Sequence, residues 1–210
     1  NNKNTNLVMG RKNKVLYGQG TINDTIDDLS FVISPEAFFQ VNPEQTEKLY
    51  QTAIQYADIN KDEVCFDIYC GIGTISLMAA KYAKKVYGVE IVEQAVVDAR
   101  ANALNNNIHN VEFFAGKAEE VVPKLYKQKI KADVVIVDPP RKGCEKPVID
   151  TIINMSPKKV VYVSCNPSTL ARDIKLLEEG GYKLIKAQPV DMFPWTVHVE
   201  CVVLMTKVQK

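Results

Sequence analysis

This sequence of 210 residues lacks an excess of charge of either sign, because 26 lysines and arginines stand against 25 aspartates and glutamates. A net charge of +1 excludes a generally basic surface, so any contact with nucleic acid has to come from a local patch or from protein outside this chain. Long apolar runs and a signal-peptide pattern are also missing, which argues against a membrane partner.

Histidine is scarce, and the cysteines lack paired spacing. The two histidines, His109 and His198, are too few for a multi-histidine metal site. The five cysteines show no Cys-x-x-Cys spacing, and their odd number argues against a disulfide framework and against a zinc site. Unpaired cysteines are typical of a reducing compartment. We therefore expect a cytoplasmic protein that folds without metal or disulfides.

The polar opening NNKNTN, without an initiating methionine, is expected to be the interior of a longer protein. Residues 15–33 alternate loosely on either side of the polar segment NDTIDD, which predicts a β-hairpin with its turn in that segment. We assign residues 1–35 to the remnant of a central β subdomain or to a linker, and residues 36–210 to one α/β domain.

From residue 42 onward, helical and strand patterns alternate. Asn42 and Pro43 are typical of a helix start. Short apolar runs separated by helical patterns predict βαβ units, and hence a mostly parallel sheet with helices on both faces. Strands are expected at 63–69, 85–90, 111–114, 132–137 and 159–164, and helices at about 73–83, 92–107, 118–127, 145–155 and 167–179. Two last strands, at 182–190 and 199–206, follow each other without a helix and predict an antiparallel hairpin at the sheet edge.

The segment FDIYCGIGTISL contains Gly71 and Gly73 between an apolar strand pattern and a helix. Glycines at such a turn let the backbone bend tightly and approach a ligand closely. The Gly-x-Gly-x-x-Gly pattern of dinucleotide sites is incomplete, because Ser76 occupies the third position. The next strand ends at Glu90, whose carboxylate can accept hydrogen bonds from both ribose hydroxyls. This combination favours an adenosine-containing cofactor over an ordinary strand–helix turn with a solvated carboxylate.

Two further strand ends carry polar residues at the same edge of the predicted sheet. A valine-rich strand runs into Asp138, and the Pro-Pro pair after it stiffens the loop. Another leads to Cys165, just before an Asn-Pro turn that opens a helix. Most free cysteines are inert buried side chains, and Cys65 and Cys201 fit that interpretation. Cys165 differs, because ligands bind beyond the carboxyl ends of parallel strands and a helix N-terminus can lower the pKa of a thiol.

The last strand pattern begins near Glu200, and His198 lies two residues before it, so the two side chains should share one face. Apolar neighbours at the mouth of a strand can raise the pKa of a glutamate and make it a general base. A surface carboxylate on an edge strand is the competing interpretation. His198 fits a packing or hydrogen-bonding role better than that of a metal ligand.

Six segments together resemble the catalytic domain of the S-adenosylmethionine-dependent RNA uracil-5 methyltransferases. The resemblance covers residues 15 to 205, and the motifs occur in the order of that family. The segments are FFQVN (38–42), DIYCGIGTISL (67–77), YGVE (87–90), VDPPRKG (137–143), VSCNPSTLARD (163–173) and DMFPWTVHVE (191–200). The combination of FFQVN, DPPR, SCNP and HVE is not shared by other class I methyltransferases.

The resemblance implies a reaction that these residue types can carry out. Cys165 would attack C6 of a uracil and form a covalent adduct, which makes C5 nucleophilic enough to accept a methyl group from S-adenosylmethionine. Glu200 would then remove the C5 proton, and elimination of Cys165 would release 5-methyluridine. The implied cofactor contacts are Gln40, Tyr69, Gly71, Thr74, Glu90 and Asp138. Thr74 and Lys117 stand where some members have asparagine, and Arg141 is expected to meet RNA phosphate or to order its loop.

The resemblance also implies the fold and the partner. The fold is the α/β class I (Rossmann-like) methyltransferase fold, with a mostly parallel seven-stranded sheet, an antiparallel C-terminal hairpin and helices on both faces. The expected partner is RNA, in particular 23S ribosomal RNA, with transfer RNA as the alternative; no protein partner is implied. Family members commonly begin with a β-barrel RNA-binding domain, and many bind an iron–sulfur cluster. Neither can be placed here, so residues 36–210 are expected to be the catalytic domain alone.

Three other functions are weighed against this one. A methyltransferase acting on amino groups of adenine or guanine also uses a Pro-Pro loop, but Arg141 after the prolines and Cys165 disfavour it. A non-catalytic RNA-binding module that retains the cofactor fold would have no use for Cys165, Glu200 and Glu90 together. A nicotinamide oxidoreductase is disfavoured by Ser76 and by the lack of a hydride-transfer acid/base signature.

Overall fold

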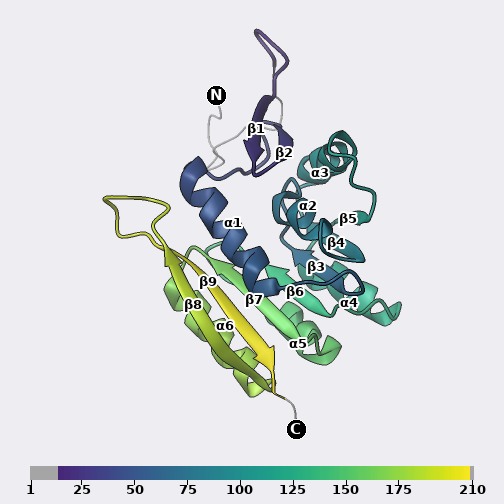
Figure 1. The fold of residues 1–210 in the computed structure, drawn as a ribbon, viewed down its shortest axis with the longest axis vertical. Helices are drawn as coiled ribbons and strands as arrows, with labels where there is room; N and C mark the ends of the chain where they lie inside the picture. The colour runs from purple at the N-terminus through teal and green to yellow at the C-terminus, as the bar shows by residue number, and fades with distance from the viewer. Residues whose placement is uncertain (1–13, 209–210) are drawn as a thin grey trace, which may run out of the picture.

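The structure, a computed structural model, describes residues 14–208. Seven strands form one sheet in the order β5-β4-β3-β6-β7-β9-β8 (Figure 1). Neighbours from β5 through β7 pair in parallel, whereas β9 is antiparallel to both β7 and β8. The strands are β3 (Val64–Ile68), β4 (Lys85–Glu90), β5 (Val111–Ala115), β6 (Val134–Val137), β7 (Lys159–Ser164), β8 (Tyr182–Val190) and β9 (Glu200–Lys207). The mostly parallel sheet and its antiparallel C-terminal hairpin are confirmed.

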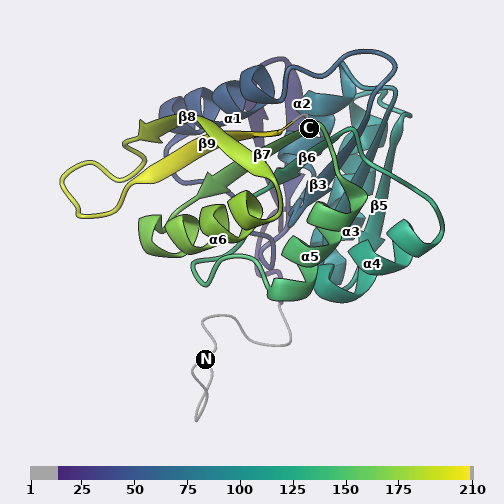
Figure 2. The same cartoon turned by 90° about the horizontal axis from the view of Figure 1, so that it is seen from below.

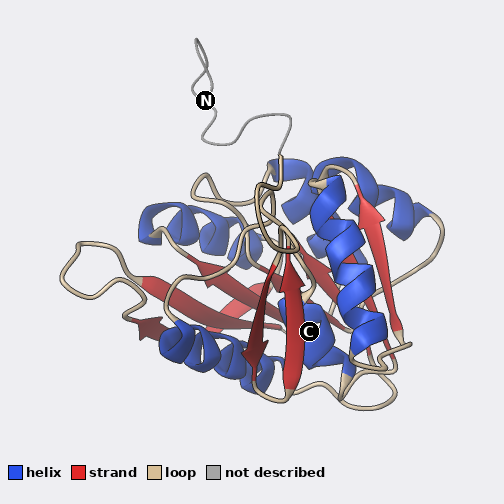
Figure 3. Cartoon of the chain, turned by 90° about the horizontal axis from the view of Figure 1, so that it is seen from above, coloured by secondary structure: helices blue, strands red, loops and turns tan. Residues whose placement is uncertain are grey.

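Two layers of helices enclose the sheet (Figures 2 and 3). Helices α1, α2 and α3 belong to one hydrophobic cluster, and α4, α5 and α6 belong to the other. Within a strand the side chains alternate, so Cys65 of β3 lies in the first cluster and Phe66 in the second. The helices are α1 (Pro43–Ala57), α2 (Thr74–Ala80), α3 (Glu93–Asn105), α4 (Ala118–Lys127), α5 (Lys146–Met155) and α6 (Pro167–Glu179). Within residues 14–208, no helix is long and apolar enough to cross a membrane.

The N-terminal hairpin differs from its prediction. Its strands are β1 (Ile22–Ile26) and β2 (Leu29–Ile33), so the turn is only Asp27 and Asp28, and most of the predicted turn segment is strand. Asp27 takes the left-handed conformation, at φ 57°, that a two-residue hairpin turn requires. Residues 15–21, expected as a strand, form none. The buried side chains Ile26, Leu29, Phe31 and Ile33 join the first hydrophobic cluster.

The free edge of β2 is bonded to side chains of α3 rather than to another strand. Ser34, Val32 and Ser30 donate their backbone N–H groups to Asp98, Asn102 and Asn106 at 3.1, 2.8 and 2.9 Å. The amide groups of Asn102 and Asn106 donate back to the carbonyls of Val32 and Ser30. Four helical residues rise about 6.0 Å and two strand residues about 6.6 Å, so the two spacings match. A polar row on α3, together with its C-terminal cap residue Asn106, therefore pairs with β2 and the following Ser34 as a neighbouring strand would.

This ladder predicts that Asn102 stabilises the fold. Its carboxamide bonds Val32 and also donates to the carbonyl of Ile72 at 3.3 Å, and the side chain is 0% exposed. Replacing it with leucine should lower the free energy of unfolding by about 3 kcal/mol, since each unpaired buried group costs roughly 1–3 kcal/mol. Urea unfolding would measure this. Asn106→Ala, at the more exposed end of the ladder, is the control and should cost clearly less; equal losses would contradict the role of Asn102.

Candidate active site

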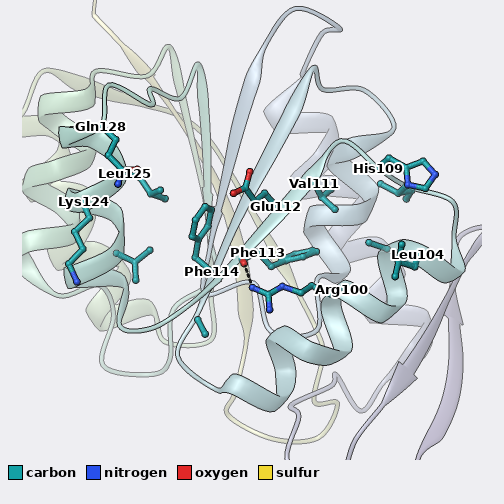
Figure 4. Close-up of a pocket in the computed structure, with 14 residues that line it drawn as sticks. Arg100, Leu104, His109, Val111, Glu112, Phe113, Phe114, Lys124, Leu125 and Gln128 are labelled. Carbon is teal, nitrogen blue, oxygen red and sulfur yellow. Dashed lines mark hydrogen bonds between the residues drawn. The ribbon is translucent and has the colours of Figure 1, made fainter.

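Two cavities have similar volumes, so the residues that line them have to show which one is the candidate site. One, of about 690 Å³, runs along the outer edge of β5 and is lined mostly by aliphatic and aromatic side chains with Arg100, His109 and Lys124 at its margin (Figure 4). The other, of about 740 Å³, lies at the carboxyl ends of the parallel strands. Every residue predicted for the site lines the second cavity: Gln40, Tyr69, Gly71, Thr74, Glu90, Asp138, Cys165 and Glu200. Ligands of open α/β sheets bind at this edge.

Strand register brings the predicted nucleophile and the predicted base together. Ser164, the last residue of β7, pairs with Cys201 of β9. The antiparallel register therefore places Cys165 opposite Glu200. Cys165 follows the last paired residue of β7, and the charge of Glu200 acts on its thiol, so the two side chains are near each other. Glu200 is 3% exposed and lies between β7 and β8, so it is not a surface carboxylate on an edge strand.

Side-chain alternation adds two more carboxyl groups to the same face. Cys65 and Ile136 belong to the first hydrophobic cluster. Asp67 and Asp138 each lie two residues after one of them, on β3 and just after β6, so they face the same side of the sheet. Burial raises the pKa of Asp67 to about 7. Burial, together with the nearby charges of Glu200 and Asp67, raises the pKa of Asp138 to about 8. The cavity floor therefore combines acidic groups that favour a cationic ligand.

The surroundings of Cys165 oppose ionisation of its thiol. Burial raises its pKa first, and the charges of Glu200 and Asp138 raise it further, while Arg141 acts in the opposite direction. The backbone hydrogen bond at Cys165 does act to lower this pKa, but burial and the two carboxylates outweigh it, so the net direction is upward. Burial also raises the pKa of Glu200, again with Arg141 opposing. A carboxylate with a raised pKa is a stronger base, which suits Glu200 to accept a proton.

The glycine loop after β3 fixes the position of Glu90. Gly71 donates its N–H to one carboxylate oxygen of Glu90 at 3.1 Å, and Val92 donates to the other at 2.9 Å. Gly71 has φ 54°, and a side chain there would meet no neighbour, so the glycine serves the backbone conformation. Gly73 differs, because a Cβ would lie 2.9 Å from the ring of Phe113. Two bonds hold Glu90 at the cavity wall, and its remaining lone pairs are available to hydroxyl groups.

The departure from the dinucleotide pattern has a structural role. Ser76 donates its hydroxyl to Oδ2 of Asp67 at 2.6 Å. The other oxygen, Oδ1, is buried and has no hydrogen-bond partner among the described residues. A buried acceptor without a donor is costly, and here it lines the cavity. Sequence reasoning noticed Ser76 but missed Asp67; an aspartate inside an otherwise apolar strand was the available signal.

Helix α1 supplies a second wall that the sequence did not reveal. Tyr50 is 6% exposed, and its pKa is raised by burial and by the charges of Asp138, Asp67 and Glu200. Gln40 is also buried, and its side chain acts to lower the pKa of this phenol. No sequence pattern distinguished Tyr50 from an ordinary core residue of an amphipathic helix.

The loops that carry Arg141 and Cys165 are bonded to each other through α6. Asn166 and Thr169 both donate to the carbonyl of Arg141, at 3.0 and 3.1 Å. Deeper in the fold, Asp173 is 0% exposed and accepts hydrogen bonds from the hydroxyl of Tyr162 at 2.6 Å and from the N–H of Cys144 at 2.8 Å. The DPPR loop therefore takes its position from the helix that begins beside Cys165.

His198 lies outside the strand that was predicted to contain it. Strand β9 begins at Glu200, and His198 is exposed in the preceding loop, where its ring contacts Phe193 edge-on at 6.3 Å between centroids. It therefore does not share a strand face with Glu200. Its role is a packing contact with a residue that lines the cavity.

Asp173 is predicted to hold the two loops together. Asp173→Ala should lower the free energy of unfolding by about 3 kcal/mol, because two buried donors lose a charged acceptor. Urea unfolding followed by circular dichroism would measure the loss. Asp150→Ala is the matched control: Asp150 forms an exposed pair with Lys146 on α5, and such pairs contribute about 0.3–0.5 kcal/mol.

Burial of Asp138 at the cavity is predicted to lower the stability of the fold. Its pKa of about 8 lies above that of an unfolded aspartate, so stability from this group is present at low pH and is lost as pH rises toward 8. Asp138→Asn should therefore raise stability, most strongly above pH 8, by at least about 1 kcal/mol, or roughly 2–4 °C in Tm. The exposed Asp62→Asn is the control. An unchanged Tm difference between pH 5 and pH 8.5 would contradict the assignment.

The comparisons with known proteins agree with this geometry. A family model described as tRNA (Uracil-5-)-methyltransferase matches residues 4–208. Proteins named as uncharacterized RNA methyltransferases share 59% identity with all of this chain in Bacillus cereus (strain ATCC 10987) and 58% over 98% of it in Listeria innocua. Each match spans 46% of the relative, so the chain covers about half the length of these proteins.

A solved structure adds the fold. The tRNA (uracil-54, C5)-methyltransferase of Pyrococcus abyssi, determined in complex with S-adenosyl-L-homocysteine, is 34% identical and superposes with a TM-score of 0.78. The superposition covers 90% of this chain and 45% of that one. The fold is thus the predicted class I methyltransferase fold, and the chain belongs to the tRNA (uracil-5-)-methyltransferase family.

Proposed function

We propose that this chain is the catalytic domain of an enzyme that transfers a methyl group from S-adenosylmethionine to C5 of a uridine in RNA. The observation that carries the proposal is the opposition of Cys165 and Glu200 across the β7–β9 pair, at the wall of a 740 Å³ cavity. A nucleophile and a base on one side of a cavity are what covalent activation of uracil requires.

The cofactor fit rests on observations of this structure. S-adenosylmethionine would supply a methyl group from its positively charged sulfonium. The raised pKa values of Asp67 and Asp138 mark carboxyl groups that gain from a cation. Glu90, held by Gly71 and Val92, offers two oxygens to ribose hydroxyls. Gln40, Tyr69 and Thr74 line the same cavity, and the P. abyssi relative holds S-adenosyl-L-homocysteine.

The proposed roles follow from chemistry. The thiolate of Cys165 adds to C6 of uracil, and the electron pair of the C5–C6 double bond moves toward C5 and the O4 carbonyl. C5 then has the nucleophilic character that it needs to take up a methyl group. Glu200 accepts the remaining C5 proton, the double bond re-forms, and the bond to Cys165 breaks. The pKa of the thiol is raised, so formation of the thiolate needs a nearby positive charge. Arg141 supplies one, because its charge acts to lower this pKa.

We propose 23S ribosomal RNA as the substrate, on the resemblance of the sequence motifs to the bacterial ribosomal enzymes. Transfer RNA is the second candidate, favoured by the family description and by the P. abyssi relative, which acts on uracil 54 of transfer RNA. Both RNAs reach such a site by extrusion of the target base into the cavity. A cytoplasmic location goes with either substrate.

The roles are tested by methyl transfer from labelled S-adenosylmethionine to unmodified 23S ribosomal RNA and to transfer RNA, with the product nucleoside identified by mass. Cys165→Ala should give neither 5-methyluridine nor an adduct. Glu200→Gln should still add to the base but release it slowly, lowering turnover by roughly 10²–10⁴-fold and leaving a protein–RNA adduct on a denaturing gel. The B. cereus relative controls for RNA contacts outside this chain. Full turnover by Cys165→Ala would refute the mechanism.

A further inference from the structure

The loop between β8 and β9 exposes the single tryptophan of the sequence. Trp195 is 104% exposed, and Val197, two residues later, is 95% exposed. The loop projects beyond the sheet and its helices (Figures 1 and 2). An indole left fully in water adds nothing to the hydrophobic stabilisation of the fold. Its position therefore calls for a binding partner.

The turn that carries Trp195 is built by specific hydrogen bonds. Thr196 donates its backbone N–H and its hydroxyl to the carbonyl of Phe193, at 3.2 and 2.7 Å, and its hydroxyl accepts the N–H of His198 at 3.1 Å. Trp195 itself has φ 67°, a left-handed conformation that is uncommon for a bulky residue. The turn holds the indole outward at a cost in backbone strain.

The same turn is anchored at the catalytic cavity. Phe193 and Glu200 both line the cavity, and Trp195 lies between them in the chain. On the other side, Asn42 donates to the carbonyl of Met192 at 3.2 Å, and Met192 is 1% exposed. The indole is thus one tight turn away from a cavity-lining ring. Whatever it binds has to lie beside the entrance to the site.

RNA that delivers a base to this cavity necessarily exposes other bases. Extrusion of the target breaks its stacking on both neighbours, whose faces then need new contacts. Aromatic side chains supply such contacts for unpaired bases of any sequence. Trp195 and Val197 together are also too small for a protein interface, which usually buries about 800 Å² per partner.

We infer that Trp195 is a stacking platform for an unpaired RNA base next to the target uridine. This inference rests on the proposed function, because it takes the cavity beside the loop to be the site for uridine. The partner is single-stranded RNA, recognised through a base face rather than through its phosphates. Stacking of this kind places the neighbouring nucleotide and leaves the target base free to enter the cavity.

The experiment uses the fluorescence of Trp195 and the anisotropy of a labelled RNA. Unlabelled oligouridine of twelve nucleotides should quench the indole of the wild-type chain, whereas a blunt RNA duplex of the same length should not. Anisotropy with the labelled oligomer should show Trp195→Ala binding roughly 5- to 150-fold more weakly and Trp195→Phe close to wild type. Tyr82→Ala is the matched control: Tyr82 is 49% exposed and precedes β4, at the amino ends of the parallel strands and away from the cavity, so this variant should bind normally.

Two further measurements separate stacking from other roles. The slope of affinity against salt should be the same for Trp195→Ala and wild type, since that slope counts phosphate contacts. Trp195→Gly should keep or raise Tm, because glycine adopts a positive φ without strain, and yet bind RNA as weakly as Trp195→Ala. A fall in Tm would instead assign the tryptophan a structural role and overturn the inference.

The remaining outcomes are also decisive. No quenching by oligouridine, or equal affinity of Trp195→Ala and wild type, would overturn the platform, while methylation that depends on Cys165 would leave the proposed function intact. Quenching and a Trp195-dependent affinity without any methyl transfer would support the platform and count against the proposed function. Indole emission that changes with protein concentration alone would identify a second copy of the chain as the partner and overturn the inference.

Discussion

The antiparallel pairing of β7 with β9 is the constraint on which the site depends. Ser164 opposite Cys201 puts Cys165 opposite Glu200, on the face that α1, α2 and α3 cover. A shift of the register by one residue would turn Glu200 toward the other face and place Cys201 opposite Cys165. The hairpin with β8 guards against such a shift, because β9 is paired along both of its edges. Strand β9, which lies between β7 and β8, thus sets the position of Glu200 relative to Cys165.

That arrangement brings buried carboxyl groups together. Other parts of the domain offset the free energy that their burial costs. Asp67 and Asp138 have pKa values of about 7 and 8 because water is excluded from their surroundings. Such groups weaken the fold at neutral pH, a cost that the proposed binding of a cationic cofactor would offset. Hydrogen bonds near the cavity stabilise the same part of the fold. Asp173 of α6 accepts the N–H of Cys144 in the loop after DPPR, and two backbone N–H groups hold Glu90. The destabilising carboxyl groups and the stabilising hydrogen bonds therefore lie in neighbouring segments at the carboxyl ends of the strands.

The sequence predicted the main sheet, because apolar runs and helical periods alternate clearly from Asn42 onward. Cys165 and Asp138 follow parallel strands and Glu200 begins β9, and all three line one cavity as the sequence predicted; their chemical roles stay predictions. Sequence reasoning failed where tertiary contacts decide the outcome. The first strand of the N-terminal hairpin depends on pairing with β2 and on the polar row of α3, which local alternation cannot show. The pKa of Cys165 is raised by burial and then by Glu200 and Asp138, which lie far away in the chain, so the helix start alone could not show the net direction.

The ladder between β2 and α3 has a consequence for the order in which the chain folds during its synthesis. Its hydrogen bonds join residues 64, 70 and 76 positions apart. The hairpin leaves the ribosome before the helix that completes its open edge has been made. At about 5–20 residues per second, some 70 residues take roughly 4 to 14 seconds to add. Until α3 is made, the backbone groups of β2 that bond to its side chains lack these partners, and Ser30 with the turn residues Asp27 and Asp28 leaves polar side chains near that edge.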